Sequence, residues 1–366
     1  MMAPGNSEGS KGEPSILRQE VVSIATGSEQ TPGTSEASHY RPRAEGAVQC
    51  LLCPQGCFIQ SDERGFCQTR VNNDGVLVVT NYGKVTSIGI DPIEKKPLYH
   101  FYPGRNILSL GTFGCSLGCR FCQNWQISQE EPGYSVVMPH RVAELAREAA
   151  VEGDSIGVAY TYSEPLMWYE YLMDTVDLIR GLGQKNVLVT NGYINPEPLR
   201  DLLPKIDALN IDVKAMKDDF YQEICEGHVT PVLRTVEAAT EMGCHTEITN
   251  LVIPGRNDSK EDIGALVDWV ASVNPDIPLH FSRYYPQYQM REAATPVETL
   301  KKAREIALEK LNYVYIGNAW DHEASASYCP NCSSTLIRRT GFGAKSIGLK
   351  GDRCASCGEK VSIVQE

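Results

Sequence analysis

The chain has 366 residues, of which 42% are hydrophobic, and 34 Lys and Arg stand against 46 Asp and Glu, giving a formal net charge of −12. The hydrophobic content excludes a wholly disordered chain, and the negative charge argues against nucleic acid or an anionic membrane as a partner. The sequence contains neither an apolar run long enough to span a bilayer nor a signal-peptide pattern, so we expect a cytoplasmic protein.

Residues 1–46 are rich in Gly, Ser, Pro, Thr and Glu. This composition is typical of disorder, and we predict a disordered tail. Residues 47–106 follow as a small unit rich in Cys and Gly. A short strand is expected at residues 76–80, because the turn sequence Asn73-Asp74-Gly75 directly precedes this apolar run.

The first cysteine cluster lies in this N-terminal unit and consists of Cys50, Cys53, Cys57 and Cys67. Four thiolates could close around zinc or hold a second iron–sulfur cluster, and the spacing does not choose between them. Disulfide bonds between these cysteines are a third alternative, which a reducing compartment disfavours. Iron at this site would favour electron relay, whereas zinc would favour a structural cap.

Residues 107–325 alternate short apolar runs with amphipathic stretches, which predicts repeated strand–helix units. The predicted strands are 107–111, 156–161, 187–190, 208–213, 246–253, 279–283 and 313–316, and the predicted helices are 141–151, 165–182, 231–243, 260–273 and 296–311. Such units imply parallel strands with right-handed crossovers. We therefore predict an α/β fold with a partial (β/α)6 TIM-type barrel. A doubly wound sheet is the alternative, which periodicity alone does not separate from the barrel.

The second cluster, Cys115-Ser-Leu-Gly-Cys119-Arg-Phe-Cys122, directly follows the first strand of this predicted barrel. A 4Fe-4S cluster needs a ligand on each iron, so three thiolates leave one iron open to a substrate or cofactor. In (β/α) barrels the chemistry lies at the C-terminal ends of the strands. A structural zinc site is disfavoured, because it normally takes four ligands and this loop contains no His.

The third cluster lies in residues 326–366 and pairs Cys329-Pro-Asn-Cys332 with Cys354-Ala-Ser-Cys357. Closed four-thiolate zinc sites fold small units that lack a core, so we favour zinc in a zinc-ribbon-like unit. The two remaining cysteines, Cys225 and Cys244, stand alone and are interpreted as buried apolar residues.

With Phe121 as its aromatic residue, the central pattern resembles the signature of radical S-adenosylmethionine (SAM) enzymes. The resemblance implies a 4Fe-4S cluster on Cys115, Cys119 and Cys122, with SAM bound at the open iron. In that family the reduced cluster cleaves SAM to a 5′-deoxyadenosyl radical, which abstracts hydrogen from a substrate. Phe121 would then offer an apolar face near the adenine.

Further positions match the family one at a time. Glu164, in Tyr-Ser-Glu-Pro, resembles the acidic motif that binds the SAM amino group, although Tyr-Ser replaces the usual Gly-Gly. Its alternative is a helix cap. Thr190 and Asn191 resemble the segment that contacts the ribose, and a plain strand-to-helix turn is their alternative.

Two more matches point to the branch that activates glycyl-radical enzymes. Asp212 and Lys214 resemble a motif in which both residues face the cofactor pocket. The alternative is a simple ion pair, because two residues spaced two apart lie on the same face of a strand. His280 lies on the sixth predicted strand, as in that branch, although a lone His is more often structural. The resemblance assigns Lys214 and His280 as catalytic, and Asp212 to cofactor binding.

From about residue 48 to residue 364 the chain resembles the radical enzyme of the AmmeMemoRadiSam system, a group similar to pyruvate formate-lyase activating enzymes. The match rests on four stretches: Cys50-Leu-Leu-Cys53-Pro-Gln-Gly-Cys57, Gly114-Cys115-Ser-Leu-Gly-Cys119-Arg-Phe-Cys122-Gln-Asn-Trp125, Ala159-Tyr-Thr-Tyr-Ser-Glu-Pro165 and the terminal Cys unit. It implies a low-potential electron donor of flavodoxin or ferredoxin type and leaves room for Memo-like partner proteins; the substrate stays unnamed. The alternatives are a glycyl-radical-enzyme activating enzyme and, from another class, a non-catalytic zinc-rich scaffold.

Overall fold

The central sheet is made of strands that are buried on both faces. In β11 (Ser155–Tyr160) every residue is buried, as expected of a parallel strand covered on both sides. The computed structural model describes residues 33–319 and 322–365, and within them this sheet has eight strands, ordered β16-β15-β14-β13-β12-β11-β9-β8. The other seven are β8 (Ser87–Pro92), β9 (Asn106–Gly111), β12 (Lys185–Thr190), β13 (Ala208–Asp212), β14 (His245–Val252), β15 (Leu279–Arg283) and β16 (Val314–Gly317).

From β9 to β16 the strands are parallel and follow the order of the chain. A doubly wound sheet reverses its strand order at a switch point, so the sequential order separates this fold from that alternative. Strand β8 pairs antiparallel with β9, which makes the sheet mixed. Strands β8 and β16 occupy its two edges and do not pair with each other within the described residues.

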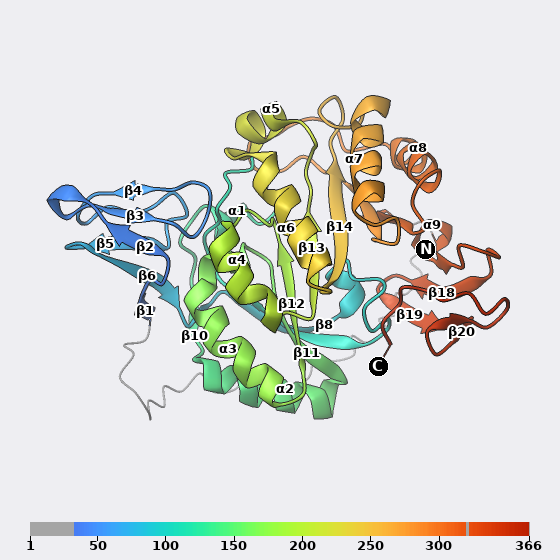
Figure 1. Ribbon diagram of the computed structural model, residues 1–366, viewed down its shortest axis with the longest axis horizontal. Coiled ribbons are helices and arrows are strands. Elements are labelled where there is room, and N and C mark those ends of the chain that lie inside the picture. The colour runs from blue at the N-terminus through green and yellow to red at the C-terminus, as the bar shows by residue number, and fades with distance from the viewer. Residues whose placement is uncertain (1–32, 320–321, 366) are drawn as a thin grey trace, which may run out of the picture.

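Helices follow the parallel strands and cover the sheet, as Figure 1 shows. The sequence signals at their ends are visible: Ser259 caps α7 by accepting a hydrogen bond from the Asp262 amide, and Pro139 opens α2. The main helices are α2 (Pro139–Gly153), α3 (Tyr169–Gly181), α4 (Pro196–Leu202), α6 (Val229–Glu241), α7 (Lys260–Val273) and α8 (Val297–Leu308). Shorter segments are η2 (Ala44–Gly46), η3 (Ile93–Lys95), α1 (Trp125–Ser128), η4 (Pro165–Trp168), η5 (Leu203–Lys205), α5 (Asp218–Phe220), the π-helical turn η6 (Tyr221–Cys225) and α9 (His322–Ser325). None of the helices in the described ranges is both long and apolar enough to cross a membrane.

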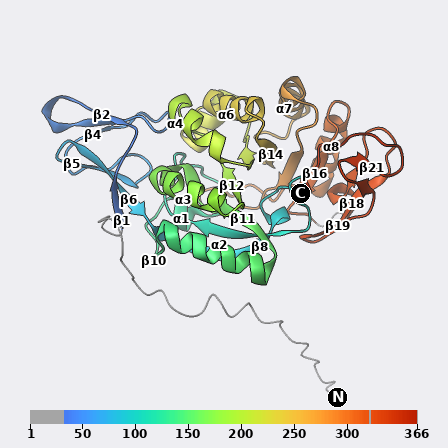
Figure 2. The same ribbon diagram turned by 60° about the horizontal axis from the view of Figure 1, so that its bottom comes forward.

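Small antiparallel sheets form the N-terminal region, at one end of the molecule (blue in Figures 1 and 2). Its strands are β1 (Gly33–Glu36), β2 (Tyr40–Pro42), β3 (Val48–Cys50), β4 (Phe58–Ile59), β5 (Arg70–Asn73), β6 (Val76–Tyr82) and β7 (Lys84–Val85), and β10 (Ser135–Val136) pairs with β7. The expected strand at residues 76–80 is part of β6. Strand β8 falls inside the unit predicted at 47–106, yet its hydrogen bonds to β9 make it part of the central sheet.

The predicted disorder of residues 1–46 is corrected for residues 33–46. Strand β1 pairs with β6 and β2 with β3, and the amide of Ala37 donates to the Leu77 carbonyl at 2.8 Å. These partners lie outside the segment, so its own composition did not reveal them. The rest of the predicted tail, residues 1–32, lies outside the described residues.

The C-terminal unit lies at the opposite end of the molecule (red in Figure 1). Its strands are β17 (Ser327–Tyr328), β18 (Thr335–Thr340), β19 (Gly343–Ser346), β20 (Leu349–Lys350) and β21 (Arg353–Cys354). Val364 exchanges backbone hydrogen bonds with the loop between β8 and β9, donating to the His100 carbonyl and accepting from the Tyr102 amide, both at 2.8 Å. The chain end thereby fastens this unit to the central sheet.

Candidate active site

The three central cysteines lie on the loop that joins β9 to α1. Backbone hydrogen bonds hold this loop against the π-helical turn η6: the amide of Gly118 donates to the Cys225 carbonyl and that of Arg120 to the Ile224 carbonyl, both at 2.9 Å. Cys119 is buried, and Cys115 and Cys122 are half-buried. The loop therefore presents three thiols from a fixed backbone at the C-terminal end of a strand.

The spacing of these thiols suits a cluster better than a single ion. Among the residues that the structure describes, the three sulfurs do not form a set lying within 4.8 Å of one another. Tetrahedral zinc with bonds of about 2.3 Å draws its sulfurs closer than that, whereas each thiolate of a 4Fe-4S cluster binds a different iron. The donor set thus fits the cluster that the sequence predicts.

Gly114 brings the N-terminal region against this loop. It has φ +88°, and a Cβ atom placed on it would overlap Thr69 Cγ2 and lie 2.6 Å from the Cys67 carbonyl oxygen. Only glycine combines this backbone conformation with such a close approach. The segment that carries Cys67 therefore packs directly beside Cys115.

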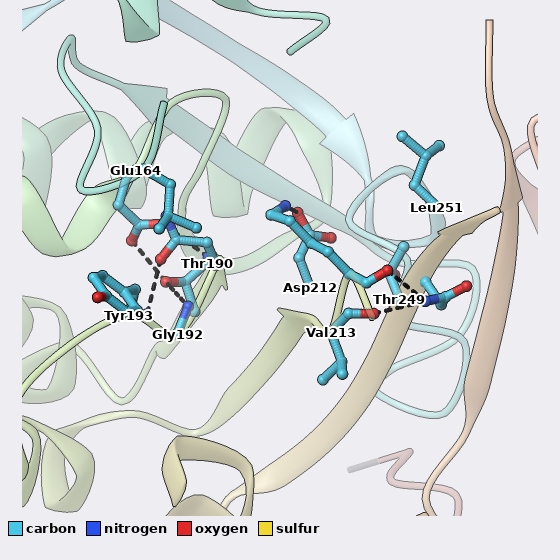
Figure 3. Close-up of polar contacts among 12 residues, drawn as sticks. Glu164, Thr190, Gly192, Tyr193, Asp212, Val213, Thr249 and Leu251 are labelled. Atoms are coloured by element: carbon cyan, nitrogen blue, oxygen red, sulfur yellow. Dashed lines mark hydrogen bonds and ion pairs between the residues drawn. The ribbon is translucent and has the colours of Figure 1, made fainter. Parts of the chain in front are cut away.

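Glu164 and Thr190 extend from the ends of adjacent strands, and their side chains point toward one another in Figure 3. The buried carboxylate of Glu164 accepts hydrogen bonds from the Thr190 hydroxyl (2.6 Å), the Asn191 amide (2.8 Å) and the Leu166 amide (3.0 Å). Burial raises the pKa of Glu164 to about 7, although these three donors oppose the shift. A cationic amine placed beside this carboxylate would restore its charge.

Asn191 connects this acidic site to the cysteine loop. Its side-chain amide nitrogen lies 3.5 Å from Cys115 Sγ and 3.2 Å from Ser116 Oγ. The residue predicted to contact a ribose thus already touches a predicted cluster ligand. Glu164, Thr190, Asn191 and Cys115 form one continuous group.

Asp212 and Lys214 lie at the end of β13, two strands from Glu164. Lys214 Nζ pairs with Asp212 Oδ2 at 3.0 Å and stands 5.6 Å from the centre of the Phe121 ring. Burial alone would lower the pKa of Lys214, but Asp212 and the thiols of Cys119 and Cys225 raise it well above its usual value. The pairing that the sequence left as an alternative therefore exists, and the cation also lies beside a predicted cluster ligand.

Cys225 is the residue of this site that the sequence analysis missed. It is fully buried in η6, and burial raises its pKa well above the usual thiol value. The proton it retains is shared in a hydrogen bond with Cys119, whose pKa is lowered by that bond and by Lys214. No spacing signal marks a single cysteine more than a hundred residues beyond the loop, so only the fold brings the two thiols together.

His280 is predicted to be catalytic, and the structure places it in a buried polar network on β14 and β15. Its Nε2 lies 2.7 Å from Glu247 Oε2, and Tyr99 packs edge-on against its ring. Glu247 also accepts from the amides of Tyr99 and His100 and lies 2.9 Å from His245. The ring is thus held in place, and its catalytic role stays a prediction.

The four C-terminal cysteines converge as a closed metal site. Their sulfurs all lie within 4.8 Å of one another, with Cys329 and Cys357 at 3.6 Å and Cys332 and Cys354 at 3.7 Å. Four zinc–thiolate bonds of about 2.3 Å produce sulfur separations of this size. The arrangement fits the zinc that the sequence favours.

A cavity in the described part of the chain lies away from these groups. It has a volume of about 480 Å³ between α4 and α6, with Pro54 at its rim, and none of the predicted site residues lines it. Its walls are mainly apolar. We therefore place the candidate active site at the cysteine loop, where the charged and thiol groups converge.

Comparison with known proteins supports this placement. The model of the Radical SAM superfamily matches residues 109–270, a stretch that contains the cysteine loop, Glu164, Thr190 and Lys214. The uncharacterized protein MJ0808 of Methanocaldococcus jannaschii is 44% identical over 337 residues, which cover 90% of this chain and 99% of that protein.

More distant similarity extends to activating enzymes. A pyruvate formate-lyase-activating enzyme of Staphylococcus epidermidis is 26% identical over 175 residues, covering 45% of this chain and 69% of that enzyme. A solved domain of pyruvate-formate lyase-activating enzyme from Bacteroides vulgatus ATCC 8482 aligns with a TM-score of 0.39 at 22% identity. It covers 44% of this chain and 99% of that domain.

Proposed function

This chain contains a Radical SAM superfamily domain and belongs to one family with MJ0808. We propose that it is an enzyme that reductively cleaves SAM and uses the resulting 5′-deoxyadenosyl radical to take hydrogen from a substrate. The observation that carries the proposal is the loop that places the thiols of Cys115, Cys119 and Cys122 directly after β9, with Asn191 and the Glu164 carboxylate beside Cys115. A 4Fe-4S cluster bound there supplies the electron for the cleavage.

The chain's own residues provide the rest of the site. Glu164 would hold the amino group of SAM through a charge-assisted hydrogen bond, and Thr190 and the Asn191 amide already orient its carboxylate. Asn191 would lie beside both the cluster ligand Cys115 and the ribose. Phe121 is buried and would shield the adenine side from water.

Lys214 contributes a fixed positive charge. Its ammonium pairs with the Asp212 carboxylate, and its charge lowers the pKa of the Cys119 thiol, which favours the thiolate form that binds iron. We propose a catalytic role for Lys214 and for His280, the latter held by Glu247. His280→Gln should lower the production of 5′-deoxyadenosine while iron content is retained. Lys214→Met should lower the production of 5′-deoxyadenosine and also weaken iron binding, because its charge favours the Cys119 thiolate.

The test of the proposed function is anaerobic reconstitution with iron and sulfide, reduction with dithionite and measurement of 5′-deoxyadenosine. Product is expected from the wild-type protein and from Cys244→Ala, whose thiol lies outside the three clusters and faces the carbonyls of Leu203 and Ile206. Cys119→Ala should abolish it. Absence of product from the wild type, or product undiminished in Cys119→Ala, would reject the proposal, and zinc without iron would favour a scaffold.

At a finer level we propose a role like that of the radical enzyme of the AmmeMemoRadiSam system. The resemblance of the N-terminal Cys segment, of the segment ending in Glu164 and of the terminal Cys unit supports this role. It would bring Memo-like partner proteins and a flavodoxin or ferredoxin as electron donor. Co-purification of a Memo-like protein with the tagged full chain from anaerobic extract tests it, and recovery equal to that from an untagged control would count against it.

A second candidate is an activating enzyme for a glycyl-radical enzyme, favoured by the 26% identity to a pyruvate formate-lyase-activating enzyme. Electron paramagnetic resonance distinguishes an activating enzyme from an enzyme that modifies another substrate. A glycyl doublet that appears on a candidate partner after turnover supports activation. Turnover without that doublet supports modification of another substrate.

A further inference from the structure

The four N-terminal cysteines converge on one small buried cavity. Cys50, Cys53, Cys57 and Cys67 all line it, and Arg70 and Met167 complete part of the wall. Cys50, Cys53 and Cys67 are buried, and Cys57 is half-buried. Four thiols around one enclosed space form a ligand set for a metal centre rather than two separate pairs.

The spacing of these thiols differs from that of the C-terminal set. In the described part of the chain, only Cys329, Cys332, Cys354 and Cys357 bring three or more ligand atoms within 4.8 Å of one another. A zinc ion would require the same compact arrangement of the N-terminal sulfurs, because zinc–sulfur bonds are about 2.3 Å long. Iron–sulfur clusters distribute their thiolates over two or four irons and hold them farther apart.

Arg70 supplies an independent sign of an anionic occupant. Its guanidinium is buried and binds Glu170 through Nη2, at 3.0 and 2.8 Å from the two carboxylate oxygens. Its Nε and Nη1 have no hydrogen-bond partner within the described residues, although Arg70 lines the cavity. Buried donors without acceptors are costly, and the sulfur atoms of a cluster would accept from them.

We propose that Cys50, Cys53, Cys57 and Cys67 bind a second iron–sulfur cluster and that this cluster relays electrons to the central loop. Its sulfurs would accept hydrogen bonds from Arg70, and the Phe66 amide already lies 3.4 Å from Cys57 Sγ. Hydrogen bonds to the sulfurs and burial are the features that set the reduction potential of such clusters.

The position of the site explains the relay. The carbonyl oxygen of Cys67 abuts Gly114, and the Gln55 side chain, from the segment between Cys53 and Cys57, donates to the Ser116 carbonyl at 3.0 Å. Both chain neighbours of Cys115 thus contact the N-terminal ligand segments. One electron from a flavodoxin- or ferredoxin-type donor reduces the N-terminal cluster, which is reoxidised when the electron passes to the central cluster.

Metal analysis tests the proposed cluster directly. In Cys115→Ala/Cys119→Ala/Cys122→Ala, purified without oxygen, about two or four irons per chain should remain, with about one zinc from the C-terminal set. Loss of all iron together with about two zincs would overturn the proposal. Circular dichroism checks the fold of this variant, and Mössbauer spectra distinguish a 2Fe-2S from a 4Fe-4S cluster.

The wild-type protein provides a test that needs no variant. It should hold about six or eight irons per chain, against about four if only the central loop binds a cluster. Cys67→Ala should lose the additional iron, and the matched control Cys244→Ala should keep it. An iron content of about four in the wild type would refute the second cluster.

The relay rests on the proposed function, whereas the iron content does not. With a reduced flavodoxin as donor, Cys67→Ala should form 5′-deoxyadenosine at least about tenfold more slowly than wild type, while dithionite should support both proteins. Equal rates with flavodoxin would reject the relay. A wild type that retains the additional iron but makes no 5′-deoxyadenosine with either reductant would reject the proposed function and leave the second cluster standing.

Discussion

The hydroxyl of Thr190, at the end of β12, donates a 2.6 Å hydrogen bond to the carboxylate of Glu164, which follows β11. Together with the amides of Asn191 and Leu166, this donor fixes the orientation of the Glu164 carboxyl group. The geometry is ready for an amine before any ligand arrives. The pKa of the Glu164 carboxyl group is, however, about 7, so both its protonated and its ionised form are present near neutral pH.

We expect the affinity for SAM to rise with pH through about 7. Burial raises the pKa of Glu164 to about 7, so the carboxyl is mostly protonated below that pH and ionised above it. An ammonium group binds the ionised form, so affinity should gain up to about tenfold per pH unit below the pKa and level off above it. Equilibrium dialysis at pH 6 and pH 8 measures the difference.

Glu164→Gln should remove this pH dependence and weaken binding at pH 8. The control is Glu241→Gln, an exposed carboxylate on α6, which should behave as wild type. A wild-type affinity that is flat between the two pH values would show that Glu164 does not meet the amine.

Cys225→Ala should make the reduction midpoint of the central cluster more negative. The thiol of Cys225 shares a hydrogen bond with Cys119, and such bonds to a cluster ligand stabilise the more negatively charged, reduced state. Alanine keeps the backbone carbonyl that accepts from Gly118. Potentiometric titration followed by electron paramagnetic resonance measures the shift.

The iron content of Cys225→Ala tests whether one iron of the central cluster lacks a protein ligand. Iron content should stay at the wild-type level, as it should in Cys244→Ala. Loss of the central iron in Cys225→Ala would identify Cys225 as a fourth protein ligand and leave SAM without an open position.

Gly114→Ala should destabilise the protein by about 1–3 kcal/mol, because the new methyl group meets Thr69 and the Cys67 carbonyl and forces them apart. Gly133→Ala is the matched control, since a Cβ atom there has nothing within 4 Å. Urea unfolding measures both free energies. Equal stabilities would mean that the N-terminal segment does not press on the cysteine loop.

Arg339→Met should loosen the C-terminal unit from the central sheet. The buried guanidinium donates to Ser327 Oγ at 2.9 Å and stands 4.2 Å from the centre of the Tyr99 ring, and its Nε lies 3.8 Å from the buried Glu94. Burial raises the pKa of Glu94 to about 7 while Arg339 opposes the shift, so removal of the cation should raise that pKa further.

We expect a loss of about 1–3 kcal/mol, the usual cost of leaving buried hydrogen-bond acceptors without their donor, because Glu94 can take up a proton once the cation is gone. Arg338→Met is the control, because the neighbouring residue on β18 is exposed. Thermal unfolding and limited proteolysis after residue 326 report the difference. Identical proteolysis of the two variants would contradict the anchoring role.

The parallel strands and the helices between them could be predicted from the sequence because their signals are local. The strand Leu279–Arg283 and the helix Lys260–Val273 have the predicted limits, since one alternates apolar and polar residues from Leu279 and the other begins after the capping Ser259. The strands between residues 33 and 46 have no such pattern. They exist because β6 and β3 supply hydrogen-bonding partners.

The site likewise contains residues that local motifs predicted and one residue that only the fold brings there. Glu164 follows β11, Thr190 ends β12 and Lys214 follows β13, so the parallel order of the sheet brings them to one edge. Cys225 belongs to a different loop and reaches Cys119 only through the π-helical turn. A tertiary contact of that kind leaves no trace in residue spacing.

The contact between Cys67 and Gly114 has a consequence for maturation. The loop that accepts the central metal centre is shaped partly by a segment that must itself be organised by four thiols. Each centre can form alone, but filling of the N-terminal site should speed the filling of the central loop. Cys67→Ala should therefore take up its central iron more slowly than the wild type and still reach the same final content.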